Sequence, residues 1–406
     1  MSKRAILLIL GLAGFVAMAD NWVVSPTLPA ISASLHVDPV QAGVVITAYM
    51  IPFGLFQLVF GPLADRFGKR QVIGVAMLLF TVATGLCATA FSLTNLAIYR
   101  ALTGAFAASV MPVSLALIGD IFPIAERQSA IGTFMGISFL GQGLSMAIGG
   151  SIAYFYSWRG VFAVYSLLAV VSTVLLFTAG RQIPSARNPH SEILAPYGRL
   201  LGRATSLFTY LVVLFEGILI VGSFSYLGAF ISKTYHYSFL IIGLIMTGFG
   251  VAAVVAGRLS GRLAAARGRR FTFLAGLLSA AVADILVFSA GTQLGALLVA
   301  VILLGLGFMF AHSTFLTIAT EFAAKARGTA MSLVAFCFMG GGGVGTAFGG
   351  RLIKAAGFPS FYRTYGLALL ALALVAAVAV QTKGTPAPAP TPARAPASAP
   401  KPAKQP

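Results

Sequence analysis

Long apolar stretches separated by short polar segments follow one another along the chain. Each stretch approaches or exceeds the roughly 20 residues that an α-helix needs to cross the hydrocarbon core of a membrane. The pattern predicts an all-α integral membrane protein with twelve transmembrane helices. The predicted spans are 5–31, 41–62, 71–91, 95–118, 129–153, 160–180, 205–230, 238–257, 271–291, 293–319, 329–350 and 362–381.

Composition and charge distribution agree with this pattern. The 406 residues are 58% hydrophobic and only 9% charged, whereas a soluble domain carries about 25% charged residues. The net charge of +18 alone would suggest a nucleic-acid partner. However, Lys and Arg lie mainly in every second gap between spans, as the positive-inside rule describes. We therefore expect no nucleic-acid partner, contact with membrane lipid, and a multi-pass protein of a bacterial inner membrane with both termini cytoplasmic.

Two polar segments divide the chain. Residues 181–204 are basic and predict a cytoplasmic linker between residues 1–180 and 205–381, with its part around 193–201 on the membrane surface. Residues 382–406 are rich in Pro and Ala and predict an extended, disordered tail. The N-terminus also fits a cleavable signal peptide, with Ala17-Met18-Ala19 as the cleavage site, but cleavage would leave an odd number of spans.

Residues 1–180 and 205–381 match each other at a constant offset of 200 residues. Two parallel six-helix bundles would be related by a pseudo-two-fold axis along the membrane normal, with a cavity between them that suits alternating access. The matches are Gly61, Leu63, Ala64, Gly68 and Arg70 with Gly261, Leu263, Ala264, Gly268 and Arg270; Phe122, Arg127 and Ala130 with Phe322, Arg327 and Ala330; Gly141, Gly143, Ala147, Gly149 and Gly150 with Gly341, Gly343, Ala347, Gly349 and Gly350.

The loop between the second and third predicted spans carries a specific motif. Residues 61–70 read Gly-Pro-Leu-Ala-Asp-Arg-Phe-Gly-Lys-Arg, which resembles the cytoplasmic loop motif of the major facilitator superfamily. The resemblance implies that this loop is a gate that latches the two bundles together on the cytoplasmic side. The implied gating residues are Gly61, Asp65, Arg66, Gly68 and Arg70. The second copy has Ala265 in place of Asp, so its latch should be weaker.

Three partial matches resemble the drug:proton antiporter branch of that superfamily. Asp20 precedes Leu28-Pro29-Ala30-Ile31 in the first span, and Arg100 precedes Gly104 in the fourth. The fifth span has the glycine spacing of the antiporter motif, although Ser145-Met146 replaces its Gly-Pro pair. The glycines that we expect to pack helices closely are Gly141, Gly149, Gly150, Gly341, Gly349 and Gly350.

Ionisable residues within spans are costly and are functional candidates. In the superfamily, spans 1, 4, 7 and 10 line the cavity, and here they carry Asp20, Arg100, Glu216 and His312. Two carboxylates that share one arginine cannot both be well compensated, so one is expected to bind a proton. Asp20 is the first candidate and Glu216 the second, while a structural Asp20–Arg100 pair and a structural hydrogen bond at Glu216 are the alternatives. His312 is the weakest candidate, and Asp284 in the ninth span lies outside this set.

Polar residues also recur at a regular spacing along the seventh span. Thr209, Glu216 and Ser223 recur every seven residues and predict one polar stripe along this helix.

The chain lacks the motifs of common enzyme classes. It contains no HExxH, GxSxG or Walker loop and no acidic metal cluster. Its two cysteines, Cys87 and Cys337, lie inside apolar runs, so we expect no disulfide, metal or cofactor. We predict a monomeric secondary transporter for a small organic molecule, with proton-coupled efflux first. The alternatives are uptake by proton symport or uniport and, from another class, a membrane enzyme or receptor-like protein.

Overall fold

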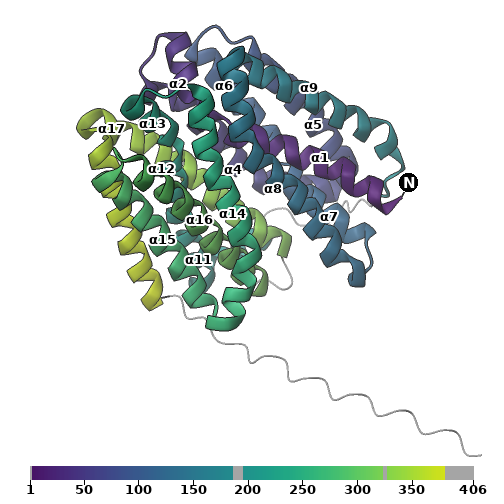
Figure 1. Cartoon of the computed structure of the whole chain (residues 1–406). Helices are drawn as coiled ribbons and strands as arrows, with labels where there is room; N and C mark the ends of the chain where they lie inside the picture. The colour runs from purple at the N-terminus through teal and green to yellow at the C-terminus, as the bar shows by residue number, and fades with distance from the viewer. Residues whose placement is uncertain (1, 186–194, 323–326, 380–406) are drawn as a thin grey trace, which may run out of the picture.

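The computed structural model describes residues 2–185, 195–322 and 327–379, and within these ranges the chain forms helices and short connections, with no strand (Figure 1). This agrees with the predicted all-α fold. The predicted tail, residues 382–406, and the middle of the predicted linker, residues 186–194, lie outside the described residues.

The helices fall into an N-terminal part, residues 3–182, and a C-terminal part, residues 195–379. The elements of the N-terminal part are α1 (Lys3–Trp22), α2 (Val24–Leu35), α3 (Pro39–Ala42), α4 (Val44–Phe67), α5 (Lys69–Ala88), α6 (Leu93–Ala107), α7 (Val110–Ile121), α8 (Ile124–Phe155), α9 (Trp158–Phe177) and η1 (Ala179–Gln182). Those of the C-terminal part are α10 (Ala195–Leu201), α11 (Ala204–Glu216), the π-helix η2 (Gly217–Val221), α12 (Gly222–Ser225), α13 (Leu227–Tyr235), α14 (Phe239–Arg267), α15 (Arg269–Ala290), α16 (Leu294–Phe322) and α17 (Arg327–Ala379).

Among the described residues, 11 helical segments are long and apolar enough to cross a membrane. They are Lys3–Trp22, Pro39–Phe67, Lys69–Ala88, Leu93–Ile121, Ala130–Phe155, Trp158–Gln182, Ala204–Tyr235, Phe239–Arg267, Arg269–Ala290, Leu294–Ile318 and Thr329–Ala377. The first ten each coincide with one predicted span. The last two predicted spans fall together in the eleventh segment because α17 runs through both. Within α17, Gly357 leaves the helical conformation with φ 77° and ψ 172°.

Each part has its own set of helix contacts. In the N-terminal part, α1 packs on α8, α4 on α6, and α5 on α9. In the C-terminal part, α16 packs on α14 and α15, and α15 also packs on α17. The two parts meet where α4 contacts α17, α8 contacts α14, and α2 contacts α13 (Figure 1).

Backbone conformation repeats at the same offset of 200 residues as the sequence. His36 and His236 both have positive φ, 53° and 54°, and each caps the end of a helix. Gly68 and Gly268 have positive φ in the turns that follow α4 and α14. Positive φ is uncommon for a residue with a Cβ atom. The two histidines are therefore independent support for the internal repeat.

Glycines bring helices into close contact in both parts. A Cβ atom at Gly104 of α6 would overlap the carbonyl oxygen of Tyr49 in α4. A Cβ atom at Gly305 of α16 would overlap that of Phe249 in α14, and Phe249 is 200 residues after Tyr49. Small residues permit such backbone approach in membrane helix interfaces. The pairs α4–α6 and α14–α16 are thus packed in the same way.

The two ends of the bundle differ. We call the end formed by α2, α13 and the start of α14 the distal end. There, Ser25 of α2 donates a hydrogen bond of 2.7 Å to the Phe224 carbonyl, and Gly150 of α8 lies against Gly243 of α14. The helices of the two parts diverge toward the opposite end, where the N-terminus lies (Figure 1).

We call this opposite end the motif end. Near the N-terminus, Lys3 forms an ion pair with Glu126, and Lys69 of the loop motif contacts Asp120, which is close to Glu126 in the sequence. Helix α14 runs from the distal end to the motif end. Residues 261–270 therefore lie at the same end as residues 61–70, as the repeat predicts.

The linker helix α10 packs against the bundle at the junction of α4 and α17. The Tyr197 hydroxyl donates a hydrogen bond of 3.0 Å to the Leu58 carbonyl in α4, and Leu200 is buried. Leu58 and Tyr197 also line a cavity of about 390 Å³ together with Leu333 and Cys337 of α17. The described portion of the predicted linker is therefore in contact with both parts.

Candidate functional site

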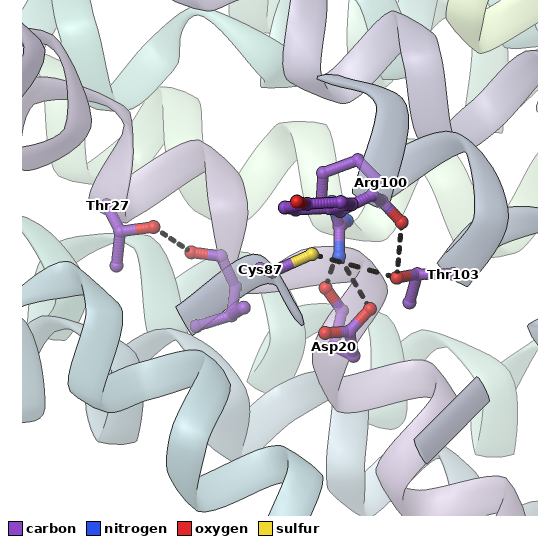
Figure 2. A network of polar contacts seen from close by, with 7 residues as sticks. Asp20, Thr27, Cys87, Arg100 and Thr103 are labelled. Atoms are coloured by element: carbon purple, nitrogen blue, oxygen red, sulfur yellow. Dashed lines mark hydrogen bonds and ion pairs between the residues drawn. The ribbon is translucent and has the colours of Figure 1, made fainter. Parts of the chain in front are cut away.

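The first buried acid–base pair joins α1 and α6. Asp20, near the end of α1, accepts a hydrogen bond of 2.6 Å from Arg100 Nη1 at Oδ2, and the Asp20 carbonyl accepts a second of 3.3 Å from Nη2 (Figure 2). Both residues have a relative exposure of 0%. Hydrogen bonds between ionised partners are shorter and stronger than neutral ones. Each charge of this pair is therefore compensated mainly by the other.

Aromatic and weakly polar groups surround this pair. The Arg100 guanidinium lies 4.1 Å from the centre of the Tyr49 ring and 5.5 Å from that of Phe162. Cys87 Sγ lies 3.7 Å from Thr103 Oγ1, next to the pair (Figure 2). Asp20 Oδ1 has no hydrogen-bond partner among the described residues. The aromatic rings add favourable contact to the cation but no further charge.

The second buried acid–base pair joins α11 and α16. His312 Nδ1 lies 3.6 Å from Glu216 Oε2, which is longer than a hydrogen bond. Both carboxyl oxygens of Glu216, which has a relative exposure of 0%, lack a hydrogen-bond donor in the described part of the chain. The His312 ring centre is 5.5 Å from that of Phe308 and 4.2 Å from that of Phe338. The Glu216 carboxyl is therefore much less well compensated than that of Asp20.

All four ionisable residues predicted for the cavity helices thus occur in contact, as two pairs. The sequence argument expected the two carboxylates to share Arg100. In the structure Arg100 contacts Asp20, and His312, the weakest of the four candidates, is the partner of Glu216. The predicted alternative of an Asp20–Arg100 pair is the geometry observed.

The polar stripe predicted along the seventh span is broken after Glu216. This residue ends α11, and the next five residues form the π-helix η2. A π-helix has i→i+5 hydrogen bonds and is frequent at functional sites. Ser223, beyond this π-helix, donates its hydrogen bond to Asp284 of α15, whereas Glu216 lies beside His312 of α16. The seven-residue spacing assumed a uniform α-helix, which is why this prediction was wrong.

An aromatic cluster lies where the two parts meet, and it was not predicted from the sequence. Trp22, the last residue of α1, packs on Phe224, Phe249 and Phe308 of the C-terminal part, with ring centres 5.1, 5.4 and 5.7 Å apart. Phe308 in turn stacks on His312. The cluster therefore connects the end of α1, two residues after Asp20, with the Glu216–His312 pair.

The loop motif forms an ionic cluster inside the N-terminal part. Lys69 Nζ lies 2.9 Å from Asp65 Oδ1 and 3.0 Å from Asp120 Oδ2 at the end of α7. The two carboxylates are about half exposed, whereas Lys69 is largely buried. These contacts join α4, α5 and α7. In the described residues, no ion pair of the motif reaches the C-terminal part, so the predicted latch between the two parts stays a prediction.

The turn of the motif is built in the same way in both copies. Gly68, with φ 100°, separates α4 from α5. Arg70 at the start of α5 donates a hydrogen bond to the Arg181 carbonyl, and its counterpart Arg270 at the start of α15 donates one to the Ala377 carbonyl. Each arginine therefore binds the end of the last helix of its own part.

Gly61 and Arg66 of the motif face α17 and α10. A Cβ atom at Gly61 would lie 3.8 Å from Ser332 Oγ, an ordinary contact. The approach is closer at Gly54 of α4, where a Cβ atom would lie 2.9 Å from the Gly340 nitrogen of α17. Arg66 lines the cavity beside α10. Close packing of α4 on α17 is therefore set by Gly54 rather than by Gly61.

The six predicted packing glycines all lie at crowded positions. A Cβ atom at Gly141 would overlap the Phe15 carbonyl of α1, and one at Gly341 would overlap the Leu214 carbonyl of α11. The other four adjoin Val23 (Gly149), the Phe239 carbonyl (Gly150), the Phe361 ring (Gly349) and the Tyr226 hydroxyl (Gly350).

Asp284 is a buried carboxyl that the sequence argument set aside. It is 1% exposed, in α15, and its Oδ1 accepts a hydrogen bond of 2.5 Å from Ser223. Asp284 lies in the ninth span, and the cavity-lining spans of the superfamily named above are the first, fourth, seventh and tenth. This is why the sequence argument did not include Asp284 among the candidates.

A comparison of the sequence with known families decides what kind of protein carries these pairs. The model of the Major Facilitator Superfamily matches residues 10–239 and 207–405. The chain belongs to this superfamily. As a member it is a multi-pass membrane transporter for a small molecule, not an enzyme.

The relatives of this chain include an uncharacterized transporter, a putative metabolite transport protein and a drug-resistance protein. The uncharacterized MFS-type transporter YceJ of Bacillus subtilis is 29% identical over 84% of this chain and 87% of its own length. A putative metabolite transport protein of Haemophilus influenzae is 28% identical over 89% and 90%. The puromycin resistance protein pur8 of Streptomyces alboniger is 34% identical over 40% and 33%.

The fold of the superfamily is also found by structural comparison. The crystal structure of the nucleoside transporter NupG superposes with a TM-score of 0.77 at 11% identity, covering 93% of this chain and 100% of that one.

Proposed function

We propose that this transporter exports a small organic compound by alternating access and that proton entry drives the export. The observation that carries the proposal is the two buried acid–base pairs, Asp20–Arg100 and Glu216–His312, each of which joins the cavity helices of one part. Ionisable groups inside membrane helices are costly and mark ion and proton pathways. Relatives named for drug resistance, such as pur8, favour efflux as the direction.

The two carboxyl groups would play different parts in coupling. Glu216 has no hydrogen-bond donor among the described residues and lies 3.6 Å from His312. A neutral carboxyl avoids the cost of an uncompensated buried charge, so in this conformation we place a proton on Glu216. Asp20 is ionised beside Arg100 and can take up a proton only when that contact weakens. This order reverses the ranking that the sequence alone favoured.

We propose twelve membrane crossings in two six-helix domains, residues 1–180 and 205–381, joined by the linker 181–204. The segment Thr329–Ala377 would be about 74 Å long as one helix of 49 residues at 1.5 Å per residue. The hydrocarbon core is only about 30 Å thick. This segment therefore crosses twice, with the turn at Gly357.

The positive-inside pattern supports a bacterial inner membrane location with both termini and the motif end in the cytoplasm. The distal end then faces the outside, where Ser25 binds the Phe224 carbonyl. We propose that the structure represents the conformation closed to the outside and that the transporter acts as a monomer surrounded by lipid.

Uptake of a metabolite by proton symport or uniport is the second candidate. Two observations favour it: Ser145-Met146 replaces the Gly-Pro pair of the antiporter motif, and the Haemophilus influenzae relative is named a putative metabolite transport protein.

The experiment that separates these functions is transport in reconstituted vesicles with an imposed pH gradient. A panel of cationic, zwitterionic and anionic compounds would be tested with and without the gradient. Efflux by antiport predicts that a compound accumulates on the side from which protons leave. Accumulation on the side that protons enter would establish symport instead, and transport that ignores the gradient would establish uniport.

A further inference from the structure

Asp284 belongs to neither acid–base pair. Its carboxyl is buried in α15, and Oδ1 accepts the short hydrogen bond from Ser223 of α12. The second oxygen, Oδ2, has no hydrogen-bond partner among the described residues. One hydroxyl donor is therefore the only described polar contact of a fully buried acid.

The surroundings of Asp284 offer no positive charge in the described structure. Helices α14, α16 and α17 pack on α15. The titratable groups of α17 that lie near Asp284 are Tyr362 and Tyr365. The Tyr362 hydroxyl has no hydrogen-bond partner among the described residues, and the Tyr365 hydroxyl donates to the Gly345 carbonyl. His312 of α16 faces Glu216, and Arg363 of α17 lies over the Phe288 ring. The basic residues of α14 and α15 are at the motif end: Arg258, Arg262, Arg267, Arg269 and Arg270.

Asp284 also lies directly behind the contact that closes the distal end. Ser223 is in the four-residue helix α12. The next two carbonyls of that helix, those of Phe224 and Ser225, accept hydrogen bonds of 2.7 and 3.1 Å from Ser25 of the N-terminal part. The same short helix therefore binds Asp284 on one side and α2 on the other.

We propose that Asp284 is a proton-binding site that controls the closure of the distal end. With a proton on Oδ2 the acid is neutral, and its hydrogen bond with Ser223 holds α12 in the position that meets α2. Release of this proton to water on the distal side leaves a carboxylate without a counter-ion, which is costly to keep buried. Helix α12 then moves away, water reaches Asp284, and the distal end opens.

This site goes beyond the proposed coupling pairs. Acid on the distal side would favour the closed distal end even in a transporter whose substrate movement is not driven by protons. Asp20 and Glu216 would not be needed for this response.

Trp22 provides a direct readout of this closure. The chain has only two tryptophans, so Trp158→Phe leaves Trp22 as the single emitter. Trp22 packs against Phe224, the residue after Ser223, with ring centres 5.1 Å apart. In lipid nanodiscs, raising the pH from acidic to mildly alkaline values should shift the Trp22 emission to longer wavelength and increase its quenching by acrylamide.

Variants assign the response. Asp284→Asn should hold the acidic-form emission at every pH, whereas Glu216→Gln, which tests the proposed coupling instead, should keep the full shift. Asp284→Glu retains the acid and should move the midpoint of the transition, which serves if the Asn variant folds poorly. Ser223→Ala should move the midpoint to lower pH. A pH response that persists unchanged in Asp284→Asn, one that vanishes in Glu216→Gln, or its absence from the Trp158→Phe protein would overturn the proposal.

Discussion

Neutralising Asp20 should destabilise the protein strongly, because it leaves Arg100 as a buried cation without a counter-ion. Removing one partner of a buried ion pair costs about 3–5 kcal/mol. Both residues have a relative exposure of 0%, so water cannot replace the lost charge. An asparagine oxygen can still accept the hydrogen bond from Arg100, and the Tyr49 ring 4.1 Å away still contacts the guanidinium. We therefore expect Asp20→Asn to lie near the lower end, about 3 kcal/mol.

The matched control removes both charges at once. In Asp20→Asn/Arg100→Gln no uncompensated ion remains, so more than half of the lost stability should return. The free energy of unfolding of the wild-type, single and double variants would be measured by titration with denaturing detergent in mixed micelles. The reasoning is refuted if Asp20→Asn stays within about 0.5 kcal/mol of wild type, the usual range for uncoupled surface changes. A double variant less stable than the single variant would refute it as well.

Three further changes test the packing and the loop motif. Gly104→Ala should cost about 1–3 kcal/mol in thermal unfolding because its Cβ atom overlaps the Tyr49 carbonyl; Gly132→Ala, with no atom within 4 Å of the new Cβ, should cost nothing. Gly357→Ala should lower stability in the same assay by roughly 1–2 kcal/mol, because its φ of 77° strains any residue with a Cβ atom; no loss would show that this break is not required. Asp65→Asn, at a half-exposed ion pair, should change stability by less than about 1 kcal/mol yet shift labelling of a motif-end cysteine toward the inward-facing form; unchanged labelling and transport would leave Asp65 without a gating role.

The spans could be predicted from the sequence because length and apolar content alone decide whether a segment crosses a membrane. The last two predicted spans are the exception, because one helix, α17, runs through both. The gap between them carries Arg351 and Lys354, yet both residues are helical, and Gly357 alone leaves the helical conformation. The repeat was visible because close packing requires glycine at corresponding places, such as Gly141 and Gly341.

The candidate site could be predicted residue by residue but not contact by contact. Ionisable side chains in apolar spans are conspicuous, so Asp20, Arg100, Glu216 and His312 were found. Their pairing depends on how helices pack and rotate, which single spans do not reveal. The π-helix after Glu216 and the contact of Ser223 with Asp284 have no signature in the hydropathy pattern.

The central claim is that buried carboxyl groups on the cavity helices couple transport to protons. Its most direct test is pH-driven transport by Asp20→Asn and Glu216→Gln in vesicles, normalised to the amount of folded protein, beside exchange of substrate down its own gradient. The account predicts that Glu216→Gln loses accumulation driven by the pH gradient while exchange continues. Full gradient-driven accumulation in both variants would contradict the carboxyl mechanism.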